Sequence, residues 1–501
     1  MEAIDIETEI NIEEKLKELR KIRALRLQKA NNENKVTQDE KIIDIKQHNT
    51  KPGFEIEQAY PIQKNKEQKH EQKNTLIDLI NFYKNNGLVG EEKTAILQTL
   101  GAIHGLCFGI ESLSGSGKSF TLDILLDLLP KESVYILPQS SDKALMYDSE
   151  KVNNSKVIVV TELQKSANNK TIIEILKDLG EGKNAERKVT KTDRSGIEEQ
   201  KIESGKSIIY TLALENWFKK DREFERRYFQ LYTDISKEQT LKILENTAQR
   251  EFLGEEKLET ISKNKVQNLK NHIKDCLELP NFRYINPFSE AVILNMPPNI
   301  KARSFIKHYL NLIQASAKFH YKSRFILEDK LFVNLEDIYF VNQLYQEQFL
   351  KSVLRIPIAG EELLSLFDNQ YDYISSSEIH KKLKRDGSPL TFPIVTDMLE
   401  ELVEAGYLEK NNYNSKESNY KKISEIKELN NYTNWQNIWE NGLNRLEENY
   451  KEYVNSFIDY QVKQERISVI NPLKNKEVIL TNEIKKDRIW GYISEIKRLW
   501  E

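Results

Sequence analysis

The segment SLSGSGKS contains the groups that bind a nucleotide phosphate. It matches the pattern GxxxxGK(S/T), except that Ser112 replaces the first glycine. Gly115 and Gly117 allow the backbone N–H groups of such a loop to point at phosphate oxygens. Lys118 would neutralise the β- and γ-phosphates, and the Ser119 hydroxyl would bind Mg²⁺. We predict an ATP-binding loop made of Ser112, Leu113, Ser114, Gly115, Ser116, Gly117, Lys118 and Ser119.

An acidic residue follows the apolar segment KVIVV. From this position the Glu162 carboxylate can orient and activate the water that attacks the γ-phosphate. Thr161 stands where a magnesium-associated Asp is common, so the metal side is unusual, and we assign the metal to Ser119 and Glu162. The alternative is that Glu162 only caps the turn from strand to helix.

Several further side chains are candidates for sensing or stabilising phosphate. Asn216 follows a third apolar segment, where it can lie between the γ-phosphate and the water, or it can be an ordinary turn residue. Arg226 and Arg227 can stabilise the phosphoryl group bound to a neighbouring subunit, or belong to a solvated charged helix. Arg303, or Lys307 one turn away, can reach the γ-phosphate as a second sensor, or both can be solvated.

A parallel sheet would position these residues. Apolar runs of strand length alternate with helical segments, and this alternation predicts an α/β fold with both faces of the sheet covered. We expect the strands at 106–112, 156–163 and 207–215, and the helices between them at 118–129 and 171–179.

Composition divides the chain and limits its function. The 501 residues include 75 Lys and Arg and 78 Asp and Glu, so the net charge of −3 leaves only local basic patches for nucleic-acid contact. No apolar run approaches the ~18 residues of a transmembrane helix, and the acidic N-terminus does not resemble a secretory signal. Cys107 and Cys276 are not spaced as a metal site or disulfide framework. We expect a cytoplasmic protein without a membrane partner.

Taken together, these residues resemble the AAA+ ATPases of the helicase clade, in particular the P-loop ATPases that plasmids, phages and archaeal elements encode for their own replication. The resemblance covers about 76–410 and rests on SLSGSGKS, VIVVTEL, GEGKNAERKV, FERRYFQL, INPFSE and segment 301–338. It implies an ATP- and Mg²⁺-dependent ring, a homo-hexamer, that acts on DNA as a replicative helicase or origin-remodelling ATPase beside a primase or other replication proteins. The alternative is an ATP-switched regulator or loader that recruits proteins without translocating.

The sequence from Arg187 to Ile197 reads as a β-hairpin with an Asp-Arg-Ser-Gly turn. In the helicase clade a hairpin at this place projects into the ring channel, where Lys188, Lys191 and Arg194 would hold the backbone of single-stranded DNA. An exposed polar hairpin without this role is the alternative.

The segment 361–410 reads as a winged helix. Ser375 and Glu378 have the spacing of a capping box, and a helix at 391–405 ends at Gly406 before a strand. That helix carries acidic residues, which argue against groove binding: Asp397, Glu400, Glu401 and Glu404. Better phosphate contacts lie on the preceding helix: His380, Lys381, Lys382, Lys384 and Arg385. DNA binding and protein contact both stay open for this domain.

The full predicted organisation has five parts. They are a charged helical or disordered extension at 1–74, an AAA+ core at 75–236, a helical lid at 237–350, a winged-helix domain at 351–410 and a charged helical extension at 411–501.

Overall fold

The chain divides into two compact units, Met1–Glu71 and Gln72–Glu501. The computed structural model describes residues 75–138, 144–166, 170–190, 197–213, 222–253, 262–294, 296, 300–357, 359–367, 373–411, 418–424, 434–462 and 466–481. All of them belong to the second unit, so the extension predicted at 1–74 lies outside the described residues.

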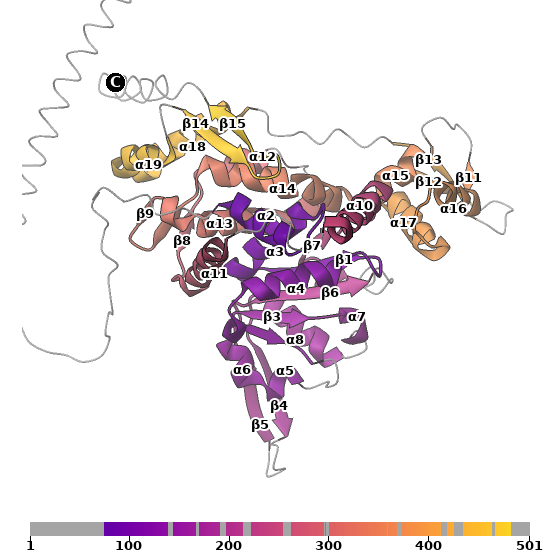
Figure 1. Ribbon diagram of the computed structural model, residues 1–501, viewed down its shortest axis with the longest axis horizontal. Helices are drawn as coiled ribbons and strands as arrows, with labels where there is room; N and C mark the ends of the chain where they lie inside the picture. The colour runs from indigo at the N-terminus through magenta and orange to yellow at the C-terminus, as the bar shows by residue number, and fades with distance from the viewer. Residues whose placement is uncertain are drawn as a thin grey trace, which may run out of the picture. The chain divides into compact units, whose positions relative to one another are not determined.

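The second unit contains a five-stranded parallel sheet (Figure 1). Its strands lie in the order β2-β3-β6-β1-β7, and each neighbouring pair is parallel. They are β1 (Cys107–Ser112), β2 (Val134–Ile136), β3 (Val157–Val160), β6 (Ser207–Ala213) and β7 (Phe229–Tyr232). The predicted α/β fold with a parallel sheet is therefore confirmed, and β6 separates the strand of the glycine-rich loop from the strand that precedes Glu162.

Both faces of this sheet are buried, as its continuous apolar strands require. Side chains on β1 and β6 alternate between two cores: Phe108 and Ile209 belong to the first, and Ile208 and Tyr210 to the second. Helices of the first core include α2 (Leu76–Asn85), α3 (Glu92–His104) and α4 (Lys118–Leu128), and those of the second α5 (Ala144–Tyr147), α6 (Ser149–Asn154), α7 (Leu163–Ser166) and α8 (Lys170–Gly180).

The first core extends through the region predicted as a helical lid. Two long helices, α13 (Ile300–Phe319) and α14 (Leu335–Leu354), pack on each other and on α3. The region also contains α10 (Lys237–Leu253), α11 (Lys263–Glu278), α12 (Ser289–Leu294) and a small sheet of β8 (Arg283–Ile285), β9 (Ile326–Leu327) and β10 (Lys330–Phe332). Apart from α10, whose Leu241, Leu244 and Phe252 are exposed, these elements share one core with the helices beside the glycine-rich loop.

A buried ion pair joins the start of α14 to the small sheet. The Arg324 guanidinium donates to both carboxylate oxygens of Asp337, at 2.8 and 2.7 Å. Asp337 also accepts from the Ser316 hydroxyl at 2.7 Å and caps α14 together with Asn334. Burial alone would raise the pKa of Asp337, but the Arg324 charge and the hydrogen bonds from His320 and Arg324 outweigh it and lower the pKa to about 2.

Residues 360–422, together with Ile356 and Ala359, form a third core, and Leu113 of the glycine-rich loop packs against it. Its elements are α15 (Gly360–Ser365), β11 (Ile374–Ser375), α16 (Ser376–Arg385), α17 (Phe392–Glu404), β12 (Leu408–Asn411) and β13 (Asn419–Lys422), and the strands form an antiparallel sheet in the order β11-β13-β12. The Ser375 hydroxyl caps α16 by accepting from the Glu378 N–H, as the spacing of the two residues predicts. Both predicted helices and the strand after Gly406 are present.

The C-terminal region differs from the charged helical extension that we predicted. Its described part contains α18 (Trp435–Tyr450), α19 (Val454–Gln461) and a hairpin of β14 (Ile467–Asn471) and β15 (Lys476–Thr481). Trp439 is fully buried and stacks on Phe288 and Phe457 in the first core. Gly442 lets α18 approach, because a Cβ there would lie 2.4 Å from the Phe288 ring. Scattered aromatic residues among many charges thus complete the core.

In the described part of the chain, no helix has both the length and the apolar composition needed to cross a lipid bilayer.

Candidate nucleotide-binding site

The glycine-rich loop that is predicted to bind phosphate, called here the phosphate loop, connects the end of β1 to the start of α4. Gly115 and Gly117 have φ angles of 80° and 88°, in the left-handed region that L side chains rarely adopt. Nothing lies within 4 Å of the position of a Cβ at either residue, so the backbone conformation rather than crowding requires glycine. Gly117 also directly precedes the 11-residue helix α4, whose first N–H groups form an anion-binding end.

A buried hydrogen-bonded pair, Tyr210 and Glu111, lies at the end of β1 where this loop begins. Tyr210 on β6 donates its hydroxyl to Glu111 Oε1 at 2.6 Å, and Glu111 directly precedes Ser112. Gly109 makes room for the aromatic ring, because a Cβ there would lie 2.0 Å from it. Burial and the Glu111 charge raise the pKa of Tyr210 well above its usual value, so the phenol stays protonated and donates.

Lys118 lies in the loop and is only 9% exposed. Its ammonium donates to the carbonyl oxygens of Ser112 at 3.0 Å and Leu113 at 2.6 Å. Burial lowers the pKa of Lys118, and the negative charge of Glu162 acts in the opposite direction. The fold therefore brings the predicted phosphate ligand and the predicted catalytic carboxylate within electrostatic reach, although they belong to non-adjacent strands.

Glu162 follows β3 in a strained backbone conformation. Its φ of 51° is in the left-handed region, which is uncommon for a residue other than glycine. Its N–H donates to the Thr211 hydroxyl on β6 at 2.9 Å, and this bond holds the turn. The carboxylate forms an ion pair with Lys165 in α7. Strained residues concentrate at functional sites, so the geometry favours a role for Glu162 beyond capping a turn.

A second set of contacts holds the loop from the side of β7. The Thr233 hydroxyl donates to Ser116 Oγ at 2.9 Å, and the next N–H, of Asp234, donates to Glu91 Oε1 at 2.6 Å. The other carboxylate oxygen of Glu91 accepts from the Thr94 hydroxyl at 2.9 Å. Burial raises the pKa of Glu91 from 4.5 to about 7. Sequence reasoning missed Glu91, whose only local signal is an acidic side chain directly before a buried helix.

Arg226 and Arg227 lie between α9 (Arg222–Glu225) and β7, just before the edge strand of the sheet. Both pair with Glu181 and Glu223, at N–O distances of 3.3 to 3.7 Å. Their side chains differ in exposure, at 49% for Arg226 and 11% for Arg227. Arg226 is therefore the better placed of the two to reach another molecule, while Arg227 contributes to the local packing.

The two remaining phosphate sensors are not joined to this site. Asn216 lies outside the described residues. Arg303 is exposed on α13, and none of the contacts among the described residues connects it to the phosphate loop. Another residue of the same helix, His308, contacts the segment of Arg226 and Arg227, called here the arginine segment: the His308 Nε2 lies 3.0 Å from the Arg226 carbonyl oxygen.

The predicted hairpin is present as β4 (Ala185–Thr190) and β5 (Ile197–Ile202), which extend beyond α5 and α6 (Figure 1). Lys188 is exposed and lies opposite Glu199 in the antiparallel register. Arg187 instead bonds Asp178 of α8 at 3.0 Å. The tip with Lys191 and Arg194 lies outside the described residues. The described strands thus carry charges of both signs.

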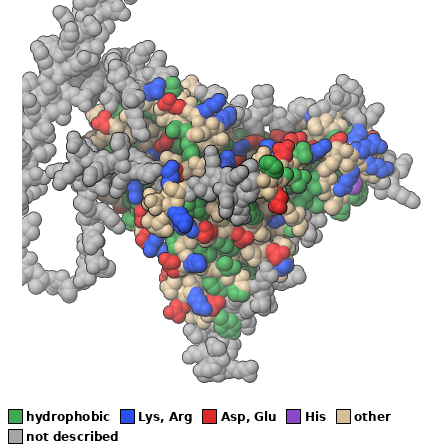
Figure 2. All heavy atoms as spheres, in the orientation of Figure 1, with side chains coloured by type: hydrophobic (Ala, Val, Ile, Leu, Met, Phe, Trp, Pro, Cys, Tyr) green, Lys and Arg blue, Asp and Glu red, His purple; other side chains and the backbone are tan. Residues whose placement is uncertain are grey.

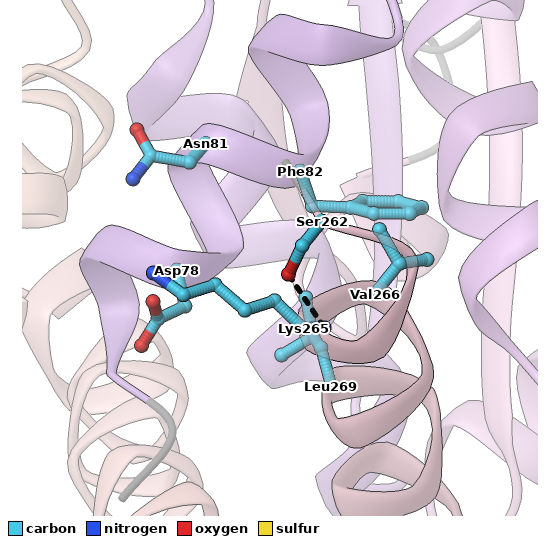
Figure 3. Close-up of a pocket in the computed structure, with 7 residues that line it drawn as sticks. All are labelled: Asp78, Asn81, Phe82, Ser262, Lys265, Val266 and Leu269. Atoms are coloured by element: carbon cyan, nitrogen blue, oxygen red, sulfur yellow. Dashed lines mark hydrogen bonds between the residues drawn. The ribbon is translucent and has the colours of Figure 1, made fainter. Parts of the chain in front are cut away.

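A separate pocket lies between α2 and α11 (Figure 3). It has a volume of about 230 Å³ and shares no residue with the phosphate loop: its lining is Asp78, Asn81, Phe82, Ser262, Lys265, Val266 and Leu269. Ser262 caps α11 through the Lys265 N–H, as the dashed line shows. No group of three His, Cys, Asp or Glu among the described residues could hold a metal ion.

Comparison with known families supports the phosphate site. Residues 92–273 match the model of the MTBMA_p00010 P-loop domain. The match runs from α3 to α11 and so includes the phosphate loop, Glu162, the hairpin and the arginine pair. A search of curated proteins finds no match. The parallel sheet and the family match fit a P-loop NTPase, which binds nucleotide and in general hydrolyses it.

Proposed function

We propose that this protein is an AAA+ motor of a mobile genetic element that hydrolyses ATP and acts on DNA. The observation that carries the proposal is the pairing of a phosphate loop with a strained carboxylate: Lys118 and Glu162 interact electrostatically across β6. A loop that only bound nucleotide would have no need of a strained acidic residue within electrostatic reach of its lysine.

The residues of the loop fit ATP with Mg²⁺. Ser119 is exposed at the first turn of α4. Nothing lies within 4 Å of the Cβ positions of Gly115 and Gly117, so phosphate oxygens have room beside this part of the backbone. A bound Mg²⁺ would neutralise charge on the phosphates. Lys118 would exchange its carbonyl contacts for the β- and γ-phosphates. Glu162 would turn from Lys165 to a water molecule, orient it in line with the γ-phosphate and accept its proton.

The arginine segment supports an assembly of several copies. Arg226 is half exposed just before the edge strand β7, where it can stabilise the phosphoryl group of a nucleotide held by a neighbouring subunit. In a homo-oligomeric ring, a hexamer, every subunit would receive such an arginine from its neighbour. The contacts of Arg226 with Glu181 and Glu223 would open when the neighbour binds.

The hairpin supports DNA as the partner. It leaves the sheet between α8 and β6, and the segment between its two strands carries Lys191 and Arg194. Cations on a projecting hairpin can hold single-stranded DNA by its phosphates, so hydrolysis that moves the hairpin would move the strand. The activity proposed is that of a replicative helicase or an origin-remodelling ATPase, with a primase among its partners.

A second function is an ATP-switched loader or regulator that recruits a protein and does not translocate. It is favoured by the acids on the described hairpin strands, where Glu199 opposes Lys188 and Glu186 pairs with Lys201 at 3.6 Å. It is also favoured by the acidic α17, which suits a basic protein better than DNA.

ATP turnover with and without single-stranded DNA separates the two functions. The triple variant Lys188→Ala, Lys191→Ala, Arg194→Ala should keep basal turnover and lose both stimulation by DNA and strand separation. Lys201→Ala, a paired lysine on the same hairpin, is the matched control and should behave as the wild type. A wild type without DNA stimulation would support the loader, and a triple variant that unwinds normally would show that the hairpin is only a surface loop.

A further inference from the structure

We propose that one face of α16 is a binding surface for the phosphate backbone of duplex DNA, independent of base sequence. This inference rests on the proposed function for its choice of DNA as the partner, and it adds a second DNA contact, separate from the hairpin. The surface consists of Lys381, Lys384 and Arg385, called here the α16 basic face.

Helical geometry places these three cations together. Ile379 and Leu383 are buried in the core of residues 360–422, and they orient α16. Residues one and four positions apart, such as Lys384 with Arg385 and Lys381 with Arg385, lie on the opposite side, within about 100° of arc. All three are exposed, and Figure 2 shows Lys and Arg side chains gathered where Figure 1 places α16.

The charge of this face is not neutralised within the described structure. Other lysines of the same domain are paired: Lys382 lies 3.7 Å from Glu378, and Lys410 lies 2.7 Å from Glu400. No described carboxylate forms an ion pair with a residue of the α16 basic face. A cluster of three cations that repel one another is tolerated at the surface, and an anionic partner would relieve the repulsion.

The neighbouring helix determines how such a partner would be recognised. The half-buried Asp397 and Glu401 and the exposed Glu404 of α17 would repel phosphates in a groove. Base edges are read from within a groove, whereas backbone contacts only position the protein. If α16 contacts the DNA backbone while α17 stays out of the groove, the domain binds DNA without preference for base sequence.

Duplex DNA fits this surface better than a single strand does. Single-strand sites combine cations with aromatic side chains on which bases stack. The α16 basic face consists of flexible aliphatic cations, and the exposed Phe392 beside it is already packed edge-on against the His380 ring. A duplex presents one charge per ~1.7 Å of axis when both strands are counted. The long side chains of the α16 basic face extend well beyond the ~6 Å of helix that carries them, so each cation can meet a different phosphate.

The test measures binding of the full chain to two fluorescent duplexes of unrelated sequence between 50 and 200 mM salt. The variant Lys381→Ala, Lys384→Ala, Arg385→Ala should lower the slope of log K against log salt by about 2.7, equally for both duplexes, and weaken binding by more than about tenfold at 100 mM. The matched control, Lys382→Ala with Lys410→Ala, removes paired lysines and should leave the slope within about one contact of the wild type.

Several outcomes would overturn the proposal. An unchanged slope in the triple variant would do so and would make an acidic protein the better occupant, as would a wild type that does not bind duplex DNA. A difference between the two duplexes would show base readout instead. The exposed positions should leave the thermal midpoint unchanged, which confirms that the variant is folded. Basal and single-strand-stimulated ATPase should also be unchanged, so failure of the motor proposal would appear separately, as absent stimulation in the wild type.

Discussion

Replacing Glu91 by Gln tests the contacts that hold the phosphate loop from the side of β7. Glutamine has the shape of the protonated carboxyl group and keeps an oxygen that can accept from the Asp234 N–H. It cannot ionise. The variant therefore removes a single property, the buried negative charge, and leaves the packing in place.

The magnitude follows from the pKa of Glu91, which burial raises from 4.5 to about 7. Between these values the folded chain holds a proton that the unfolded chain has released, so the contribution of Glu91 to stability falls as pH rises. A shift of about 2.5 units at 1.36 kcal/mol per unit amounts to about 3 kcal/mol, lost in full above pH 7. Glu91→Gln should thus be as stable as the wild type near pH 4.5 and about 3 kcal/mol more stable at pH 8.

Urea unfolding of both proteins at pH 5, 6, 7 and 8 measures this difference. The comparison is necessary because buried histidines act in the opposite direction: His272 has its pKa lowered to about 4, so its contribution rises with pH up to its unfolded value. The difference between variant and wild type isolates Glu91. A difference that stays constant with pH would refute the assigned pKa.

Nucleotide affinity provides the second readout for the same position. Glu91→Ala leaves the Asp234 N–H without its acceptor, which costs about 1–3 kcal/mol and frees the segment that holds Ser116. ATP affinity should fall for Ala and be retained for Gln in a fluorescent-nucleotide titration. Equal affinity of all three proteins would show that the contacts do not position the loop.

Four further results are expected. Lys118→Ala should lose nucleotide binding and turnover. Glu162→Gln should bind ATP and hydrolyse it at least about 100-fold more slowly in a coupled assay. Near wild-type turnover of Glu162→Gln would exclude Glu162 as the catalytic carboxylate. Arg226→Ala should keep ATP binding and lose hydrolysis, with partial recovery on mixing with Lys118→Ala chains; absent recovery would count against a shared site. Arg227→Ala should mainly lower the thermal midpoint, since its side chain is 11% exposed, and an unchanged midpoint would contradict a packing role. Arg324→Ala should cost about 3–5 kcal/mol in urea unfolding by stranding the buried Asp337 carboxylate, and a loss below about 1 kcal/mol would contradict this.

Local chemistry made part of this protein readable from its sequence. The phosphate loop could be predicted because its function depends on adjacent residues: Gly115 and Gly117 adopt left-handed conformations, and α4 begins at Lys118. Apolar runs of strand length similarly predicted the parallel sheet, and the spacing of Ser375 and Glu378 predicted the start of α16. Each of these features is determined within a few residues of chain.

Only the tertiary structure decided which distant residues act together. Glu91 and Asp234 are 143 positions apart, and Thr233 and Ser116 are 117 apart, so no local pattern marks these bonds. Sequence likewise treated Arg226 and Arg227 as equivalent, whereas in the fold the Arg227 side chain is mostly buried and the Arg226 side chain is half exposed. It also read the C-terminal region as a charged extension, although Trp439 and Phe457 meet Phe288 in the first core. Periodicity and backbone preference act between near neighbours, whereas burial and its effect on charge depend on segments that only the fold brings together.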